Sequence, residues 1–217
     1  INDAFQHFFR RVKEKKVKVG FPRFKTLNRY HSITYPQSGF KLISERRLFV
    51  SRIGSIPIVL HRVPKGKLKT FTIKRTAIGW FVIFSCEDVP VEHIDVENNH
   101  IGIDVGIENF AVLSNGERIE NPKFLIKSEK KLAKLQRRLS RKKKGSANRR
   151  KAKFRVAKVH EKIERVRNDF LHKLSNQYVK DCKLIVVEDL AIKDMMGSCY
   201  NAKNIADASW NRFVQFL

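Results

Sequence analysis

The sequence is 217 residues long and 42% apolar, which allows one large domain or two small ones with buried cores. Its 46 Lys and Arg residues outnumber 21 Asp and Glu residues, and the resulting net charge of +25 favours a polyanionic partner. No apolar run approaches the roughly 20 residues of a membrane-spanning helix, so we expect no membrane association. Three scattered cysteines without a C-x-x-C spacing argue against a disulfide framework or a zinc site in these residues.

The first 29 residues predict a basic helical segment. Phe5, Phe8, Phe9 and Val12 recur at helical spacing among Lys and Arg residues, and the run from Gly20 to Lys25 ends the pattern. The chain begins without Met or an apolar signal segment, so we expect a fragment of a longer protein.

Residues 30–98 predict an all-β domain followed by a linker at about 89–99. Six short strands separated by turn signals indicate a small antiparallel β-barrel, because closure removes exposed sheet edges. Within it, Trp80, Phe81 and Phe84 are expected in the core rather than as base-stacking residues. The expected strands are 32–35, 40–43, 48–51, 58–62, 69–75 and 80–86.

Residues 99–217 predict an α/β domain. Strands at 101–105, 108–113 and 117–120 form a meander with a tight turn at Asn115 and Gly116. Two long helices follow, and the continuous apolar run Leu184–Val187 is typical of a strand buried on both faces. We expect a loop at 192–201 and the opening of a helix at 205–217, with Asp207 or Ser209 near its cap.

The two long helices form a basic hairpin around the break at Lys144, Gly145 and Ser146. Residues 123–167 contain 20 Lys and Arg against 3 Glu, and residues 137–155 contain no acid. A solvated helix face normally mixes both signs, so we favour a nucleic-acid role over a merely solvated surface.

Carboxylates end two of the predicted strands of this domain. Asp104 lies within the first strand, and Glu188 and Asp189 follow the fourth. If these strands pair, Asp104 and one of the two later acids are neighbours, because successive strand residues point to opposite faces. This order of strands and acids is the site layout of ribonuclease-H-like folds, in which two Mg²⁺ or Mn²⁺ ions held by carboxylates cleave a phosphodiester. The alternative interpretations are a carboxylate that caps the Gly106 turn and a surface acid at a strand end.

Five motifs in order give the chain a family resemblance. They are Ala4-Phe5-x-x-Phe8-Phe9-Arg10, Gly20-Phe21-Pro22-Arg23-Phe24-Lys25, Gly102-Ile103-Asp104-Val105-Gly106, Val187-Glu188-Asp189-Leu190 and Asp207-x-Ser209-Trp210-x-x-Phe213. In these motifs the sequence resembles the TnpB/OrfB proteins of insertion sequences, relatives of type V CRISPR effector nucleases.

The resemblance implies a wedge-like barrel in residues 30–98 and a RuvC-like nuclease domain, incomplete here, in residues 99–217. It implies Asp104 and Glu188 as catalytic and metal-binding acids, with guide RNA and target DNA as partners. The cations expected to contact nucleic acid are Arg10, Arg11, Arg23, Lys25, Arg137, Arg138, Arg141, Lys142, Lys143, Arg149, Arg150 and Lys153.

The family's third catalytic Asp and its Zn²⁺ ribbon do not occur in this sequence. We therefore expect an RNA-guided, metal-dependent DNA endonuclease in the intact form and little or no cleavage by these residues alone. The alternatives are a nucleic-acid-binding remnant without chemistry and a basic structural protein of a ribonucleoprotein particle. The resemblance also implies a cytoplasmic, nucleoid-associated bacterial or archaeal protein, and we expect a monomer.

Overall fold

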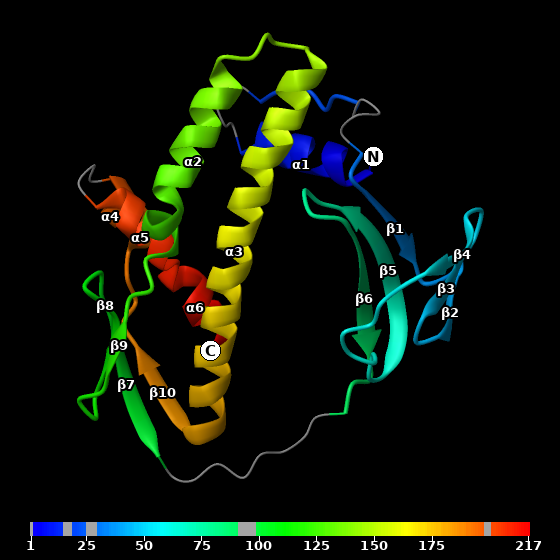
Figure 1. Ribbon diagram of the computed structural model, residues 1–217. Helices are drawn as coiled ribbons and strands as arrows, with labels where there is room; N and C mark the ends of the chain where they lie inside the picture. The colour runs from blue at the N-terminus through cyan, green and yellow to red at the C-terminus, as the bar shows by residue number, and fades with distance from the viewer. Residues whose placement is uncertain (1, 15–18, 25–29, 91–98, 198–200) are drawn as a thin grey trace. The chain divides into compact units, whose positions relative to one another are not determined.

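The computed structural model describes residues 2–14, 19–24, 30–90, 99–197 and 201–217 (Figure 1). The chain divides into two compact units, Ile1–Pro90 and Val91–Leu217. The predicted linker lies largely in 91–98, outside the described residues. No helix among the described residues is both long and apolar enough to cross a membrane.

The first unit begins with the predicted amphipathic helix. Helix α1 spans Asn2–Lys13, and the ring of Phe21 returns to lie against Phe5 and Phe8, with centroids 5.7 and 5.3 Å apart. The strands that follow are β1 (Ser32–Pro36), β2 (Phe40–Ser44), β3 (Arg47–Val50), β4 (Gly54–Pro57), β5 (Lys67–Arg75) and β6 (Trp80–Glu87).

The predicted closed barrel is wrong. The described strands of this unit form two separate antiparallel sheets, β1-β5-β6 and β2-β3-β4. The predicted strand at 58–62 is also wrong: β4 ends at Pro57, which has no N–H for a sheet ladder, and the next residue, Ile58, turns into the core. Among the described residues, no strand pairs with both sheets.

The two sheets nevertheless share one apolar core. Leu48 and Val50 of β3 pack in the same cluster as Phe71 of β5, and all three are fully buried. Phe84 of β6 packs against this core, as predicted. Trp80 does not, because 68% of its surface is exposed and its ring lies 5.7 Å from the Arg75 guanidinium.

The second unit contains a four-stranded sheet of order β10-β7-β8-β9. Its strands are β7 (His100–Val105), β8 (Asn109–Leu113), β9 (Arg118–Glu120) and β10 (Leu184–Val187). The meander β7-β8-β9 is antiparallel, whereas β10 runs parallel to β7. The predicted turn is confirmed: Gly116 has a φ of 87°, which a residue with a side chain rarely adopts.

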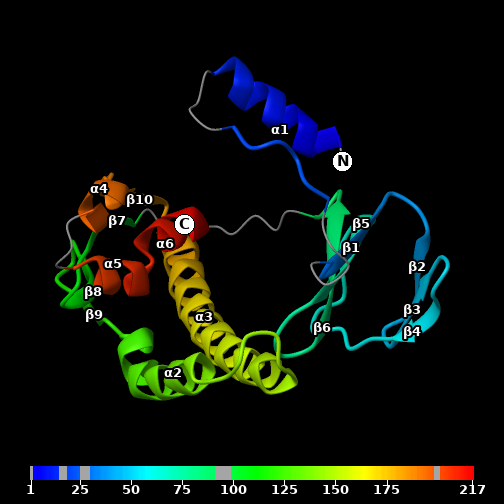
Figure 2. The ribbon, with the colours of Figure 1, turned by 90° about the horizontal axis from the view of Figure 1, so that it is seen from above.

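Long helices separate β9 from β10. Helices α2 (Phe124–Ser140) and α3 (Ala147–Asp181) pack side by side as the predicted hairpin (Figures 1 and 2). Three shorter helices end the chain: α4 (Ile192–Gly197), α5 (Ala202–Ala208) and α6 (Trp210–Phe216). Helix α4 replaces the loop predicted at 192–201, and Ser209, at a φ of 57°, divides the single helix predicted at 205–217 into α5 and α6.

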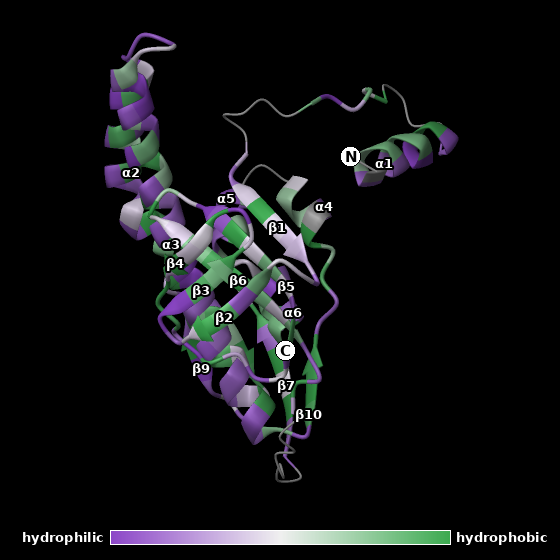
Figure 3. Cartoon of the chain, turned by 90° about the vertical axis from the view of Figure 1, so that its right-hand side faces the viewer, coloured by the Kyte–Doolittle hydropathy of each residue, from purple (hydrophilic) through white to green (hydrophobic). Residues whose placement is uncertain are grey.

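One face of this sheet forms the core of the unit. Ile103 and Phe110 from the sheet lie in the same buried cluster as Leu171 of α3 and Phe213 of α6. β10 is apolar along its length (Figure 3), but Leu184 and Val186 are 51% and 57% exposed. In the described chain, β10 is therefore not buried on both faces as predicted.

Candidate functional site

The acids predicted as catalytic lie at adjacent strand ends. β10 pairs with β7 in parallel, and the last partners in register are Val187 and Ile103. The next residues along the two strands are Glu188 and Asp104. Neighbouring strands lie roughly 5 Å apart, so the backbones that carry these two carboxylates run side by side.

Asp104 lies on the sheet face away from the core. Ile103, its neighbour, is 3% exposed in the core, whereas Asp104 is exposed, as the alternation of strand residues requires. On β10 the exposed Val186 precedes the exposed Glu188 by two residues. Asp104 is thus not the buried acid that its apolar neighbours suggest, and it can meet solvent or a ligand without a large desolvation cost.

The turn after Asp104 depends on Gly106. Its backbone N–H donates to the carbonyl of Phe110 at 3.2 Å, and a Cβ at this position would lie 3.0 Å from the carbonyl oxygen of Asn109. A larger residue would therefore require the backbone at Asn109 to shift by a few tenths of an ångström. The glycine in the Asp104-Val105-Gly106 motif is explained by this close approach.

Two carboxylates on one exposed sheet edge suit a hard divalent cation, because Mg²⁺ and Mn²⁺ prefer oxygen ligands. Asp189, the rival ligand, is also exposed next to Glu188. Within the described residues, no group of three or more His, Cys, Asp or Glu side chains comes together. The described chain can therefore supply part of a metal site from Asp104 and Glu188.

Seven of the eight predicted hairpin cations are exposed; the exception is Arg149. Its Nη1 donates to the carbonyls of Leu139 and Lys142, at 3.0 and 2.9 Å, and so ties the start of α3 to the end of α2. Ser146 caps α3 by accepting the Arg149 N–H at 3.2 Å. Arg149 thus has a structural role that its charge did not indicate.

A basic cleft lies between the arms of the hairpin. It encloses about 460 Å³. Among the predicted cations, Arg138, Arg141 and Lys142 line it, and Lys151 and Arg155, which the sequence analysis did not single out, complete it. The hairpin cations are thus divided between the cleft and the other faces of the helices.

The predicted cations near the start of the chain are only partly described. Arg10 and Arg11 are exposed on α1, and Arg10 lies within hydrogen-bond distance of His7. Arg23 is exposed, and Lys25 lies outside the described residues. The structure thus leaves three of these cations accessible to a ligand.

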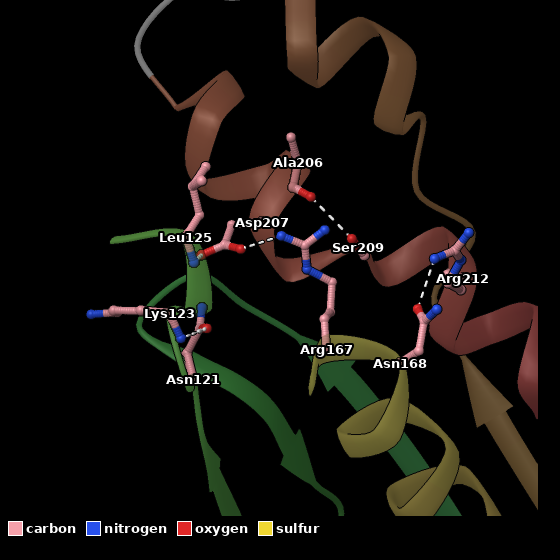
Figure 4. Close-up of polar contacts among 9 residues, drawn as sticks. All are labelled: Asn121, Lys123, Leu125, Arg167, Asn168, Ala206, Asp207, Ser209 and Arg212. Carbon is pink, nitrogen blue, oxygen red and sulfur yellow. Dashed lines mark hydrogen bonds and ion pairs between the residues drawn. The ribbon is translucent and has the colours of Figure 1, made fainter. Parts of the chain in front are cut away.

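Asp207 joins three helices in the second unit (Figure 4). Its carboxylate accepts the backbone N–H of Leu125 at 2.9 Å, in the first turn of α2, and forms an ion pair with Arg167 of α3. Asp207 is only 6% exposed. The sequence pattern predicted Asp207 near the cap of a local helix. Instead, Asp207 accepts a hydrogen bond at the start of α2, which has no side-chain cap of its own.

Comparison with known proteins finds one matching family and several similar proteins. The family model OrfB_IS605, described as "Probable transposase", matches residues 84–198. A protein of Streptomyces pristinaespiralis named "Putative RNA-guided DNA endonuclease" is 36% identical over 100% of this chain and 53% of its own length. InsQ of Escherichia coli K12, with the same descriptive name, is 33% identical over 90% of this chain and 47% of its own. The chain spans about half the length of these relatives.

Proposed function

Because this chain belongs to the OrfB_IS605 family of probable transposases, we propose that it carries part of an RNA-guided, divalent-metal-dependent DNA endonuclease. Residues 30–98 would be the wedge-like domain and residues 99–217 the RuvC-like, ribonuclease-H-like nuclease domain. The names of the two relatives, which describe RNA-guided DNA endonucleases, support guide RNA and target DNA as partners.

The observation that carries this proposal is the parallel register of β10 and β7, in which Glu188 and Asp104 follow the last paired residues, Val187 and Ile103. Asp104 and Glu188 would hold Mg²⁺ or Mn²⁺, which in such sites activates water and stabilises the leaving oxygen of a phosphodiester. The chain's own contribution is to orient these two oxygen ligands on an exposed edge. The many uncompensated cations of the hairpin would hold the nucleic acid by its backbone charge.

The metal-binding part can be tested on the 217-residue chain by NMR. On titration with Mn²⁺, the paramagnetic ion should broaden the amide signals at the ends of β7 and β10 before those elsewhere. Asp104→Asn and Glu188→Gln should each weaken this effect roughly tenfold or more in Mn²⁺ concentration, because each removes a charged ligand. Asp189→Asn is the matched control and should leave the titration unchanged.

Cleavage is tested separately, with the chain bound to the RNA of its own element and a matching DNA. We expect little or no cutting by these 217 residues, since two carboxylates hold the ions weakly. Robust Mg²⁺-dependent cutting that survives Asp104→Asn would overturn the site assignment. Retained RNA affinity without Mn²⁺ binding at the strand ends would instead support a binding remnant without chemistry.

A further inference from the structure

The cleft in the α2–α3 hairpin concentrates positive charge on facing helices. Its polar lining consists of Arg138, Arg141, Lys142, Asn148, Lys151 and Arg155. All five cations are exposed, and none forms an ion pair with another described residue. Between Glu129 and Glu161 the sequence contains no acid that could neutralise them from within the hairpin.

The chain arranges these cations in two short rows. Arg138 lies in the last turn of α2, and Arg141 and Lys142 directly follow the end of that helix at Ser140. Lys151 and Arg155 are four residues apart on α3 and stand roughly 6 Å apart along its axis. Two rows of cations across a narrow cleft suit a ligand with several negative charges in succession, rather than a single small anion.

The rest of the lining indicates which part of a nucleic acid enters. The apolar contributors are Leu135 and Ala152, and no aromatic ring from the described part of the chain lines the cleft. Unpaired bases are normally held by stacking on aromatic side chains, whereas phosphates require only donors and positive charge. The cleft therefore has the chemistry to bind a backbone and lacks the chemistry to read bases.

The hairpin end is held in shape by Arg149, which does not line the cleft. Its guanidinium joins the carbonyls of Leu139 and Lys142 across the turn, and the Ser146 hydroxyl donates to Lys143 at 2.9 Å. These bonds fix where α2 ends relative to where α3 begins. Arg149 is thus a positioning residue for the two rows of cations.

We propose that this cleft docks consecutive phosphodiester groups of a nucleic-acid strand, independently of base sequence, and that Arg149 holds it in shape. The inference rests on the proposed function for its choice of nucleic acid as the polyanion. It assigns binding to one side of the hairpin, where the charge pattern alone would spread binding over every exposed Lys and Arg.

Two triple variants of equal charge test the assignment. Arg138→Gln/Arg141→Gln/Lys151→Gln removes three of the five cleft cations, and Arg137→Gln/Arg150→Gln/Lys153→Gln removes the same residue types from the hairpin outside the cleft. Binding of fluorescein-labelled single-stranded RNA, single-stranded DNA and an RNA–DNA hybrid is followed by anisotropy over a range of salt concentrations. Circular dichroism checks that both variants keep their helices.

The cleft variant should lose roughly tenfold or more affinity at moderate salt relative to the control variant. Its slope of log K against log salt should fall by about 2 to 3, because each lost phosphate contact removes about 0.7 to 0.9 from the slope. The control variant should change by less than about 1. Equal losses of nucleic-acid affinity in the two variants would overturn the proposal. It would also be overturned if the cleft variant lost affinity only for inorganic polyphosphate, tested as a competitor, and kept its affinity for nucleic acid.

The role of Arg149 is tested with Arg149→Lys and Arg149→Gln. If the guanidinium acts by joining two carbonyls, lysine does not replace it, and both variants should weaken binding by a similar factor with little change in salt slope. Full rescue by lysine, with glutamine lowering the slope by about 1, would mean that Arg149 contacts phosphate itself. All these measurements use the Asp104→Asn background, so a failed nuclease assignment leaves their outcome unaffected.

Discussion

Tyr178 illustrates how one buried side chain in the second unit responds to its surroundings. It lies on α3 with 3% of its surface exposed, and its hydroxyl has no hydrogen-bond partner among the described residues. Burial, with a smaller contribution from the nearby Glu117 carboxylate, raises the pKa of Tyr178 from 10.0 to about 12. A phenol that ionises less readily in the folded than in the unfolded state makes the folded state sensitive to strong alkali.

We predict that Tyr178 lowers the stability of the protein above pH 10. The folded state keeps the proton up to about pH 12, whereas the unfolded chain releases it near pH 10.0, so stability is complete below pH 10 and falls between these values. The loss should reach about 2 to 3 kcal/mol in the free energy of unfolding. Urea titrations at pH 8, 10 and 11 should give a smaller decline for Tyr178→Phe than for the unchanged protein. Parallel declines would show that another group is responsible.

At the scale of elements, the connection made by Asp207 shows how the helices of the second unit are fastened. One carboxylate, 6% exposed, accepts a bond from the start of α2 and pairs with Arg167, whose side chain is 16% exposed. The contact joins segments that are 82 and 40 residues apart. A change at this single position therefore affects α2, α3 and α5 together.

We predict that Asp207→Asn lowers the free energy of unfolding by about 2 to 4 kcal/mol, since it leaves the Arg167 charge partly buried without a partner. Adding Arg167→Met should recover part of this loss, because the double variant leaves no unpaired charge. Asp169→Asn is the control: it breaks the exposed ion pair with Lys173 and should cost less than about 0.5 kcal/mol. Chemical denaturation measures all three, and a loss from Asp207→Asn no larger than the control's would contradict the prediction.

Periodicity in the sequence was sufficient to predict most elements, including the hairpin and the meander β7-β8-β9. Periodicity failed where the structure depends on pairing between strands that are distant in the sequence. The closed barrel assumed that strands adjacent in sequence join into one sheet, but β5 pairs with β1 and β6, and Pro57 ends β4. Ser209 adopts a left-handed backbone conformation, which nothing in the neighbouring sequence predicted.

In the candidate site, too, some features could be predicted from the sequence and others could not. The apolar runs that precede them drew attention to Asp104 and to the pair Glu188 and Asp189, and the family resemblance favoured Glu188. The parallel register that the prediction requires is present. The structural roles of Arg149 and Asp207 could be recognised only from the three-dimensional structure. Arg149 differs from its basic neighbours only by the carbonyls it reaches, and Asp207 serves a helix that begins 83 residues before it.

At the scale of the whole molecule, a net charge of +25 opposes folding through self-repulsion. The hairpin is the clearest source, because its cations between Glu129 and Glu161 have no acid among them. Added salt screens such repulsion and also competes with nucleic acid for the same charges. The free and the bound protein should therefore respond to salt in opposite directions.

We predict that the melting temperature of the free chain rises by several degrees between about 0.05 and 0.5 M NaCl, while that of its RNA complex falls. Calorimetry of both samples measures the two trends. The triple variant Arg137→Gln/Arg150→Gln/Lys153→Gln serves as a check, because with fewer repelling charges its free form should respond less to salt. A free chain whose melting temperature falls with salt would rule out self-repulsion as the dominant effect.

The core of the second unit has a consequence for how the protein is made. Phe110 lies against Phe213, with ring centroids 5.2 Å apart, although more than a hundred residues separate them. The strands β7, β8 and β9 leave the ribosome long before the helix that covers them, so this unit completes its folding only after Phe213 has emerged. Until then, a nascent chain carries an apolar sheet face that only α3 can cover, together with a fully synthesised basic hairpin. An RNA bound to the hairpin during translation would also keep the unfinished chain soluble.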